Sequence, residues 1–350
     1  MCLIFHKSKK YYLYKSTNMK QIYILLIALL MGLSANAEES GTCGPDLRWH
    51  LTDNAVLTIS GKGKMYDYSY DNRAPWDNYN KRIIKRIIIG DGITTIGSSA
   101  FRNCFALNSV TIPNSVRTIG EAAFEYCSAL TSVTIPNSVT TIGNHAFFGC
   151  SALTSVTIPN SVTEIGYSTF ADCSALTSVT IPNSVTIIEW STFKDCSALT
   201  SVTIPNSVTE IGSDAFSKCT NLQKVNIGNS VKTIGIAAFN KCTNITQISS
   251  EAVVPPTCES NVFDDINKSK CKLIVPKNSL DAYKQADQWK DFLLIEGSTT
   301  GITNTVYNNS GLADVYTIDG TKRLSKASTD EINALPKGMY IVNGKKIIIK

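Results

Sequence analysis

The chain repeats one 23-residue pattern in register from about residue 86 to residue 246. One copy, from Ser155 to Thr177, reads SVTIPNSVTEIGYSTFADCSALT. Each copy supplies a phenylalanine and, three residues later, a cysteine: Phe101, Phe124, Phe147, Phe170, Phe193, Phe216 and Phe239, with Cys104, Cys127, Cys150, Cys173, Cys196, Cys219 and Cys242. A unit this short cannot bury its apolar face alone, so the copies must stack. The repeat therefore predicts one elongated solenoid.

The first half of each copy has the pattern of a short strand. One copy shows the L-x-x-V-x-I spacing of an inward-facing strand at Leu130, Val133 and Ile135. This spacing points alternate side chains inward. Pro136 ends this strand because it has no N–H to donate to the ladder. The neighbouring copies are expected to pair through parallel strands.

The second half predicts a second extended run and a turn. Val139 to Ile142 form the run, and Gly143 is expected to adopt a positive φ. Ala146 and Phe147 are expected to begin a helical turn that closes at Cys150. The predicted fold is thus an α/β solenoid, mainly β: a right-handed leucine-rich repeat coil of parallel short strands with short helical turns, over residues 86–248.

Segments on both sides of the array predict caps. In residues 38–85, the alternating runs 47–51 and 56–59 flank an Asp-Asn turn and predict a β-hairpin that shields the first coil. Residues 249–297 predict a degenerate last coil and C-cap. In that cap, Ser279 is expected to be the N-cap of a helix over 280–287, and Trp289 and Phe292 to fold back over the final coil.

The repeat resembles the BspA-like leucine-rich repeats, the 23-residue class found on bacterial surfaces. The cap residues SGTCG (Ser40 to Gly44), LTISGKGKM and APW also resemble the segment that precedes such arrays. This resemblance implies a surface protein that works in adhesion.

Residues 298–350 are compositionally separate and predict a small C-terminal β-domain. The run LPKGMYIV (Leu335 to Val342), a following GKK segment and the chain end resemble the C-terminal sorting domain of type IX secretion cargo. That resemblance implies export across the outer membrane. The alternative is an ordinary terminal β-domain without an export role.

The first 37 residues predict a signal peptide. A basic region precedes the apolar run Ile22 to Leu33, and Ala35-Asn36-Ala37 forms a small-x-small site that predicts cleavage before Glu38. The alternative is a membrane anchor, but the run is much shorter than the roughly 20 residues that span a bilayer. Met19 opens a more ordinary signal peptide, and an over-extended start before Met19 is the alternative to a leader that begins at Met1. The protein is expected at the cell surface, associated with the outer membrane, or in the medium.

Charge excludes two classes of partner. The formal charge of +5 comes entirely from five lysines in the leader, and the remaining chain carries 28 basic and 28 acidic residues. A neutral exported chain gives no electrostatic reason to expect nucleic acid or an anionic membrane as a partner.

Eleven cysteines in an exported chain raise the question of disulfides. The seven in the repeats are expected to form a buried ladder of small apolar thiols. Bridging between neighbouring coils stays open, because their Cα atoms would lie roughly 5 Å apart. Cys258 and Cys271 flank a loop in the C-cap and are the predicted disulfide. No metal site is expected, because no C-x-x-C or Cys/His spacing occurs.

Catalysis finds little support in the sequence. After the leader only His50 and His145 remain, and the H-E-x-x-H, G-x-S-x-G, Walker A and G-x-G-x-x-G motifs are all missing. We therefore predict no enzymatic activity and no cofactor.

Two kinds of surface position are candidates for binding. The outward strand residues form a uniform Ser/Thr face, such as Ser155 and Thr157, which suits a repetitive glycan or is plain β-propensity. The position after the glycine of each repeat varies instead, and aromatic residues gather around it. The predicted binding residues are Phe148, Tyr167 and Trp190, with Tyr126 and His145 nearby. The alternative is that these rings pack on neighbouring turns.

The sequence predicts an adhesin or protein-binding module, with host matrix or bacterial surface proteins as partners. A glycan-binding solenoid that uses the aromatic patch and the Ser/Thr face is the alternative, and a structural spacer is the second alternative.

Overall fold

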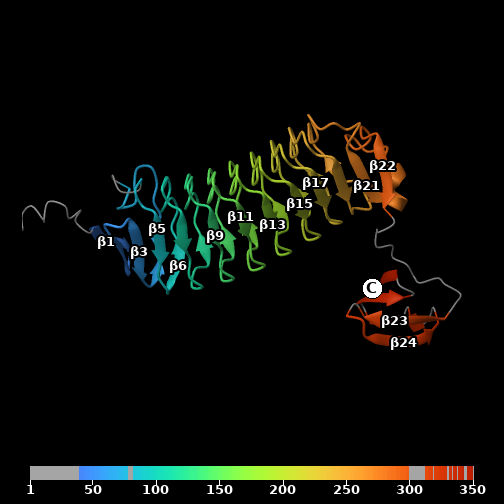
Figure 1. The fold of residues 1–350 in the computed structure, drawn as a ribbon, viewed down its shortest axis with the longest axis horizontal. Coiled ribbons are helices and arrows are strands. Elements are labelled where there is room, and N and C mark those ends of the chain that lie inside the picture. Colours follow the sequence, from blue (N-terminus) through green and yellow to red (C-terminus); the bar gives the residue numbers. More distant parts are fainter. Residues whose placement is uncertain are drawn as a thin grey trace, which may run out of the picture.

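The computed structural model describes residues 39–77, 82–298, 312–317, 319–328, 331–332, 334–336, 338–342 and 345–349. The chain forms a mainly β solenoid of about 9 turns, followed by a small separate sheet (Figure 1). The predicted leader and its cleavage site lie outside the described residues. Within the described part, no helix has the length and hydropathy that crossing a membrane requires.

The N-terminal cap is a three-stranded antiparallel sheet that continues into the array. It consists of β1 (Glu39–Gly44), β2 (Leu47–Leu51) and β3 (Val56–Gly61), and β3 pairs in parallel with β5 (Arg86–Ile89) of the first coil. The predicted hairpin of β2 and β3 is confirmed, and β1 extends it beyond the prediction. The cap thus covers the first coil and donates the first rung of its ladder.

Each coil contributes two short strands, and equivalent residues of most neighbouring coils pair in parallel, as Ser155 does with Ser132 and Ser178. After β5, the first strands are β7 (Ser109–Thr111), β9 (Ser132–Thr134), β11 (Ser155–Thr157), β13 (Ser178–Thr180), β15 (Ser201–Ile204), β17 (Lys224–Ile227), β19 (Gln247–Ser250) and β21 (Lys272–Pro276). The second strands are β4 (Gly63–Lys64), β6 (Ile93–Ile96), β8 (Thr118–Ile119), β10 (Thr141–Ile142), β12 (Glu164–Ile165), β14 (Ile187–Ile188), β16 (Glu210–Ile211), β18 (Thr233–Ile234) and β20 (Thr257–Cys258). The first ladder is interrupted between β7 and β9 and between β13 and β15, and the second between β12 and β14. The predicted parallel solenoid is confirmed.

A continuous stack of aromatic rings runs along the core. From Phe101 to Phe239, successive ring centroids lie 5.3 to 5.7 Å apart with the rings nearly parallel, and every ring is buried. Trp76 of the cap stacks on Phe101 at one end, and Trp289 packs against Phe263 at the other. The stack therefore continues into both caps.

The repeat cysteines form a buried ladder beside the rings. Each thiol from Cys127 to Cys242 donates a hydrogen bond to the phenylalanine carbonyl of the preceding coil, at 3.1 to 3.3 Å. All seven are free and fully buried. Burial raises the pKa of the Cys150 thiol to about 12. The thiols therefore act as small core side chains that also bond adjacent coils.

The turn after the second strand differs from the sequence prediction. It is a series of tight turns rather than a helical turn, and Gly143 does not take the positive φ. Two other positions per coil do so instead, such as Ala122 and Tyr126, and in the coil of Phe147 the second of them is Gly149. Gly143 is needed for another reason: a Cβ there would lie 2.7 Å from the backbone nitrogen of Glu121. Glycine at this position allows adjacent coils to approach closely.

The C-cap keeps its predicted packing but not its predicted helix. The segment contains η1 (Lys277–Ser279), the short α2 (Leu280–Tyr283) and β22 (Leu294–Ser298), which pairs in parallel with β21. The helix ends four residues before the predicted end, and Ser279 makes no capping hydrogen bond. Trp289 and Phe292 are buried against Phe263, so the predicted fold-back over the final coil is present.

The C-terminal region is a four-stranded antiparallel sheet. Its strands β23 (Ala313–Thr317), β24 (Lys322–Ala327), β25 (Gly338–Val342) and β26 (Lys345–Ile349) lie in the order β24-β23-β25-β26. Its small core includes Val315, Ile332 and Val342 and shares no residue with the core of the solenoid. The described part of this region therefore has a core of its own.

Candidate functional site

The five predicted binding residues lie together as one row of rings, which we call the aromatic stripe. Tyr126 meets Phe148 at 5.3 Å, Phe148 meets His145 at 5.5 Å, and His145 meets Tyr167 at 4.9 Å. Tyr167 then meets Trp190 at 4.8 Å, all distances being between ring centroids. The stripe crosses four consecutive coils, from the coil of Phe124 to that of Phe193.

The backbone under the aromatic stripe is held by hydrogen bonds between coils. The N–H of Tyr126 donates to the carbonyl of Phe148 at 2.7 Å, and that of His145 donates to the carbonyl of Tyr167 at 3.0 Å. Gly149 leaves room for one ring, because a Cβ there would lie 2.5 Å from the ring of Tyr126. The rings are therefore fixed before any partner binds, which reduces the entropy lost on binding.

Exposure differs along the aromatic stripe. Trp190 is 54% exposed and Tyr126 is 39% exposed, whereas Phe148, His145 and Tyr167 between them are half-buried. The sequence left two interpretations of these rings, binding residues or packing on neighbouring turns, and each describes a different part of the aromatic stripe. The middle rings pack on neighbouring turns, and the end rings are accessible anchors.

A shallow groove of about 530 Å³ lies beside the aromatic stripe, over β10, β12 and β14. Its lining includes Glu121, Thr141, Asn144, Glu164, Tyr167 and Glu189. Tyr167 belongs to both features, and the side chain of Asn144 accepts a hydrogen bond from its N–H at 3.1 Å. Aromatic stripe and groove therefore form one continuous surface, which we call the stripe–groove site. The groove itself was not predicted from the sequence.

Glu189 interrupts the second ladder at the edge of the groove. At this position of the repeat, Gly143, Gly166 and Gly212 each donate an N–H to the isoleucine of the preceding coil, at 2.7 to 2.8 Å. Of the described coils from Gly120 to Gly235, only that of Glu189 lacks this bond, and β12 and β14 are not paired. A Cβ at Gly166 would lie only 2.4 Å from the preceding coil. The Cβ of Glu189 alone does not explain the gap, because Glu259 at the same position of the last coil donates its N–H to Ile234 at 2.9 Å.

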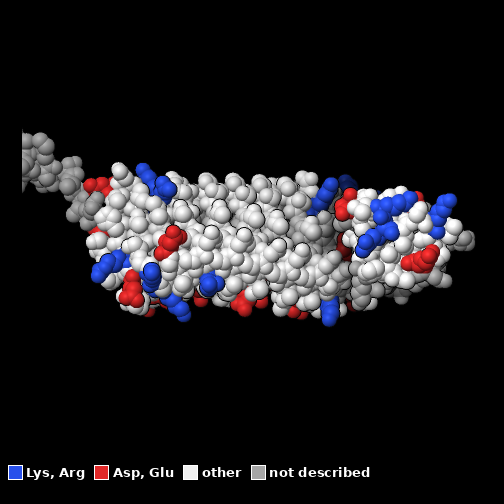
Figure 2. Space-filling view, turned by 90° about the horizontal axis from the view of Figure 1, so that it is seen from below, with Lys and Arg blue, Asp and Glu red and all other residues white. Residues whose placement is uncertain are grey.

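Charge on the middle of the solenoid is of one sign. Residues 118–193 contain no lysine or arginine and five acidic residues: Glu121, Glu125, Glu164, Asp172 and Glu189. Glu125 pairs with Arg102 at 2.7 Å, and burial raises its pKa while Arg102 opposes the shift. The three carboxylates of the groove have no ion-pair partner among the described residues. Figure 2 shows one face of the array, where charged side chains are sparse in the middle and gather toward the ends.

The Ser/Thr face is present on the first strands. Ser155 and Thr157 are exposed while Val156 between them is buried, and the same alternation occurs in β9 and β15. In the last regular coil the outward residues are Lys224 and Asn226, and Asn226 donates to the hydroxyl of Thr203 at 3.3 Å. Over several coils this face is uncharged and uniform, and a shallow hollow of about 510 Å³ lies over β13, β15 and β17.

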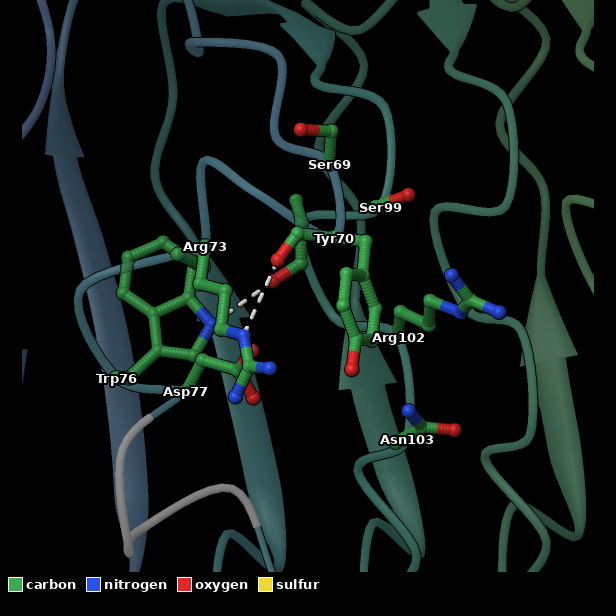
Figure 3. Close-up of a pocket in the computed structure, with 10 residues that line it drawn as sticks. Ser69, Tyr70, Arg73, Trp76, Asp77, Ser99, Arg102 and Asn103 are labelled. Atoms are coloured by element: carbon green, nitrogen blue, oxygen red, sulfur yellow. Dashed lines mark hydrogen bonds and ion pairs between the residues drawn. The ribbon is translucent and has the colours of Figure 1, made fainter.

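A second concave feature of about 160 Å³ lies between the N-terminal cap and the first coil. Figure 3 shows Arg73 and Asp77 of the cap loop on one side of Tyr70, and Arg102 and Asn103 of the coil on the other. Arg73 lies 3.9 Å from Asp77 and stacks over the ring of Tyr70, while Arg102 pairs with Glu125. Both guanidinium charges are thus compensated within the protein. We interpret this pocket as the seam that joins cap and array.

Cys258 and Cys271 differ from the sequence prediction, because the structure holds both as free thiols. Cys258 lies in β20 of the second ladder, whereas Cys271 directly precedes β21 of the first ladder. The two ladders are different faces of the coil, so closeness in sequence does not bring the sulfur atoms together. Burial raises the pKa of each thiol to about 12.

No set of three His, Cys, Asp or Glu side chains in the described residues gathers as metal ligands do. Of the two histidines that follow the leader, His50 lies in β2 of the cap and His145 in the aromatic stripe. A repeat solenoid of this kind is typically not an enzyme. The lack of enzymatic activity and of a cofactor stays a prediction.

The fold defines the class of protein: stacked 23-residue coils of short parallel strands around a buried ladder make a leucine-rich repeat solenoid. The family follows from the sequence match. The chain belongs to the BspA type leucine-rich repeat family, whose model matches 6 copies over residues 78–199 and 163–286.

Solved structures show similar arrays. A leucine-rich repeat protein of T. pallidum is 27% identical and covers 59% of this chain and 91% of its own, with a TM-score of 0.45. A leucine-rich cell surface protein of Faecalibacterium prausnitzii is 22% identical, with 76% and 96% covered and a TM-score of 0.30. The pneumococcal vaccine antigen PcpA is 13% identical, with 74% and 98% covered and a TM-score of 0.38. No curated protein sequence matches the chain.

Proposed function

We propose that this protein is an exported surface protein whose solenoid binds other proteins through the aromatic stripe. The observation that carries the proposal is the row of five rings from four coils, held by hydrogen bonds between coils and exposed at both ends. Rigid, partly exposed aromatic residues are typical binding hot spots. Adhesion to host matrix proteins or to proteins of other bacteria is the role that fits such a surface.

The geometry of the rings favours a protein partner over a glycan. Three of the four ring contacts are edge-on, with interplanar angles of 77° to 89°. A sugar chain that stacks on several rings needs ring faces that lie in one plane, and perpendicular neighbours do not provide one. Pockets between perpendicular rings instead suit the irregular side chains of a protein.

Glycan binding remains the second candidate, because the uniform Ser/Thr face offers a repetitive row of hydroxyls. A structural spacer is the third candidate. The three differ in what they require: a protein partner depends on the aromatic stripe, a glycan on ring faces or hydroxyls, and a spacer on neither.

The test compares the wild type with a Phe148→Ala, Tyr167→Ala and Trp190→Ala triple variant on arrays of matrix proteins and glycans. We expect the triple variant to lose at least tenfold in affinity for a protein ligand. The matched control is Ile236→Ala, which lies at the repeat position of Trp190 and is 48% exposed. Loss of sugar signal alone would favour the glycan candidate. Unchanged binding to every ligand would reject the aromatic stripe as the site.

We also propose that the predicted leader and the C-terminal region direct export, the latter as a type IX sorting domain. Deletion of residues 301–350 tests the sorting role. A chain that lacks them should fold but stay off the cell surface, as measured by surface labelling of intact cells. Arrival of the truncated chain at the surface would refute the sorting role and leave the binding proposal untouched.

A further inference from the structure

The stripe–groove site places aromatic rings beside acidic side chains. One side is aromatic, and ends at the exposed ring of Trp190. The other side is a groove that carries Glu121, Glu164 and Glu189 without a basic residue in its lining. Elsewhere on the array, some acidic residues of the loops are paired across coils, as Asp214 is with Lys194 and Asp195 is with Lys218. The three carboxylates of the groove have no such partner among the described residues, and they lie beside the aromatic rings.

We propose that the stripe–groove site binds an extended polypeptide segment rich in arginine and lysine. This proposal rests on the proposed function and names the chemistry of the partner. Charge complementarity carries it: the stretch 118–193 has five carboxylates and no lysine or arginine, and three of these carboxylates line one open groove. Aromatic rings beside carboxylates are also the surroundings in which a guanidinium is bound best, since it stacks on the ring and pairs with the oxygens.

The dimensions fit an extended chain. Glu121 and Glu189 are three coils apart, and coils repeat every ~4.8 Å, so the carboxylates span about 14 Å. An extended peptide advances about 3.3 Å per residue, so about five residues cover this distance. Alternate side chains of such a segment point to the same side. A segment with a basic residue at every second position therefore presents two or three cations to the groove.

Glu189 contributes in two ways. Its carboxylate lines the groove, and it lies at the point where β14 and β12 are not paired and the second ladder is open. Glu189 directly precedes Trp190. This coil therefore departs from the repeat at two adjacent positions, with glutamate in place of glycine and with an exposed tryptophan after it. The same residue thus supplies charge and space to the stripe–groove site.

The experiment measures binding of fluorescein-labelled peptides of about ten residues to the full chain by fluorescence anisotropy. The probe alternates arginine and serine, and the controls replace arginine with lysine or glutamate. We expect the arginine peptide to bind more tightly than the lysine peptide, because guanidinium stacks better on Trp190. The glutamate peptide should not bind. Raising salt from low concentration to about 1 M, where the Debye length is about 3 Å, should weaken binding at least tenfold.

Matched variants locate the site. Glu164→Gln with Glu189→Gln should weaken the arginine peptide about tenfold, as should Trp190→Ala. Glu210→Gln and Ile236→Ala remove equivalent exposed residues two coils or less beyond the site and should change affinity less than twofold. Thermal unfolding of each variant separates lost binding from lost folding.

The outcomes distinguish this proposal from the proposed function. If Trp190→Ala abolishes binding of a protein ligand while the double glutamine variant leaves it intact, the stripe binds proteins but the basic-segment inference is wrong. If the arginine peptide does not bind the wild type, or binds Glu210→Gln as weakly as the double variant, the inference also fails. Displacement of the peptide by a soluble oligosaccharide would assign the site to glycans instead.

Discussion

Two adjacent phenylalanines have separate roles in one coil. The ring of Phe147 is fully buried and stacks between Phe124 and Phe170, at 5.3 and 5.5 Å. The ring of Phe148 is half-buried on the outer turn and contacts Tyr126 and His145. One residue of the pair therefore belongs to the scaffold and the other to the binding surface.

Substitution of each phenylalanine should separate these roles. Phe147→Ala leaves a cavity in the ring stack and should lower the free energy of unfolding by about 3–5 kcal/mol. Phe148→Ala removes only outer contacts and should cost about 1 kcal/mol or less. Urea unfolding followed by circular dichroism measures both. Equal losses would contradict the assignment of Phe148 to the surface.

The buried thiols should make stability depend on alkaline pH. Because the fold raises the pKa of Cys150, its stabilising effect is complete below the ordinary thiol pKa of about 8.5 and is lost as pH rises toward about 12. Between about pH 8 and pH 10.5, Cys150→Ala should therefore lose about 2 kcal/mol less stability than the wild type. Urea unfolding at both pH values tests this, and parallel pH profiles would refute it.

At the scale of the element, the glycine after each second strand decides how closely coils approach. Gly143 and Gly166 lie so near the preceding coil that a Cβ would clash with its backbone. Where Glu189 replaces this glycine, β12 and β14 remain unpaired and a groove lies alongside. The departure from the repeat at Glu189 thus coincides with a gap in the second ladder and with a groove.

Restoring the glycine tests whether Glu189 contributes to the gap in the second ladder. Glu189→Gly should allow β14 to pair with β12. The added backbone hydrogen bond should offset the roughly 1 kcal/mol of stability that glycine costs through its greater loss of backbone entropy on folding. We expect unchanged or higher thermal stability together with at least tenfold weaker binding of the arginine peptide. Glu189→Gln should weaken binding without raising stability. A clear loss of stability in the glycine variant would mean that Glu189 does not keep the strands apart.

The sequence predicts those elements whose cause is repetition. Phe147 and Cys150 are correctly predicted as core because the same residue recurs every 23 positions, and rings such as Tyr167 and Trp190 are brought together because they share one repeat position. The role of Gly143 was wrongly predicted, because the close approach of the preceding coil, and not its own φ, requires glycine there. Likewise, the pairing of Cys258 with Cys271 depends on which ladder each residue joins, which sequence distance does not reveal.

At the scale of the whole molecule, neighbouring coils are related by a fixed step. Ser201 pairs with Lys224 and Lys224 with Gln247, so each coil contacts only the coils on either side. Both caps continue the same ring stack through Trp76 and Trp289. Stability is therefore close to a sum over coils and their interfaces.

Removal of one whole coil should be tolerated. Deletion of residues 201–223 joins Thr200 to Lys224, which occupies the strand position of Ser201. We expect a folded, slightly shorter protein with a cooperative unfolding transition. Deletion of residues 201–212 alone breaks the register and should abolish that transition. Circular dichroism and small-angle scattering measure both, and unfolding of the longer deletion would contradict a modular array.

The break at Glu189 also affects where a partner is held. A perfectly periodic rod offers the same free energy of binding at every coil, so a ligand would be distributed over many equivalent registers. The residues around Glu189 and Trp190 remove this translational degeneracy, because they occur together in one coil. Coils added or lost on either side would then change the distance from that coil to the end of the chain. They would not change the place at which the partner binds.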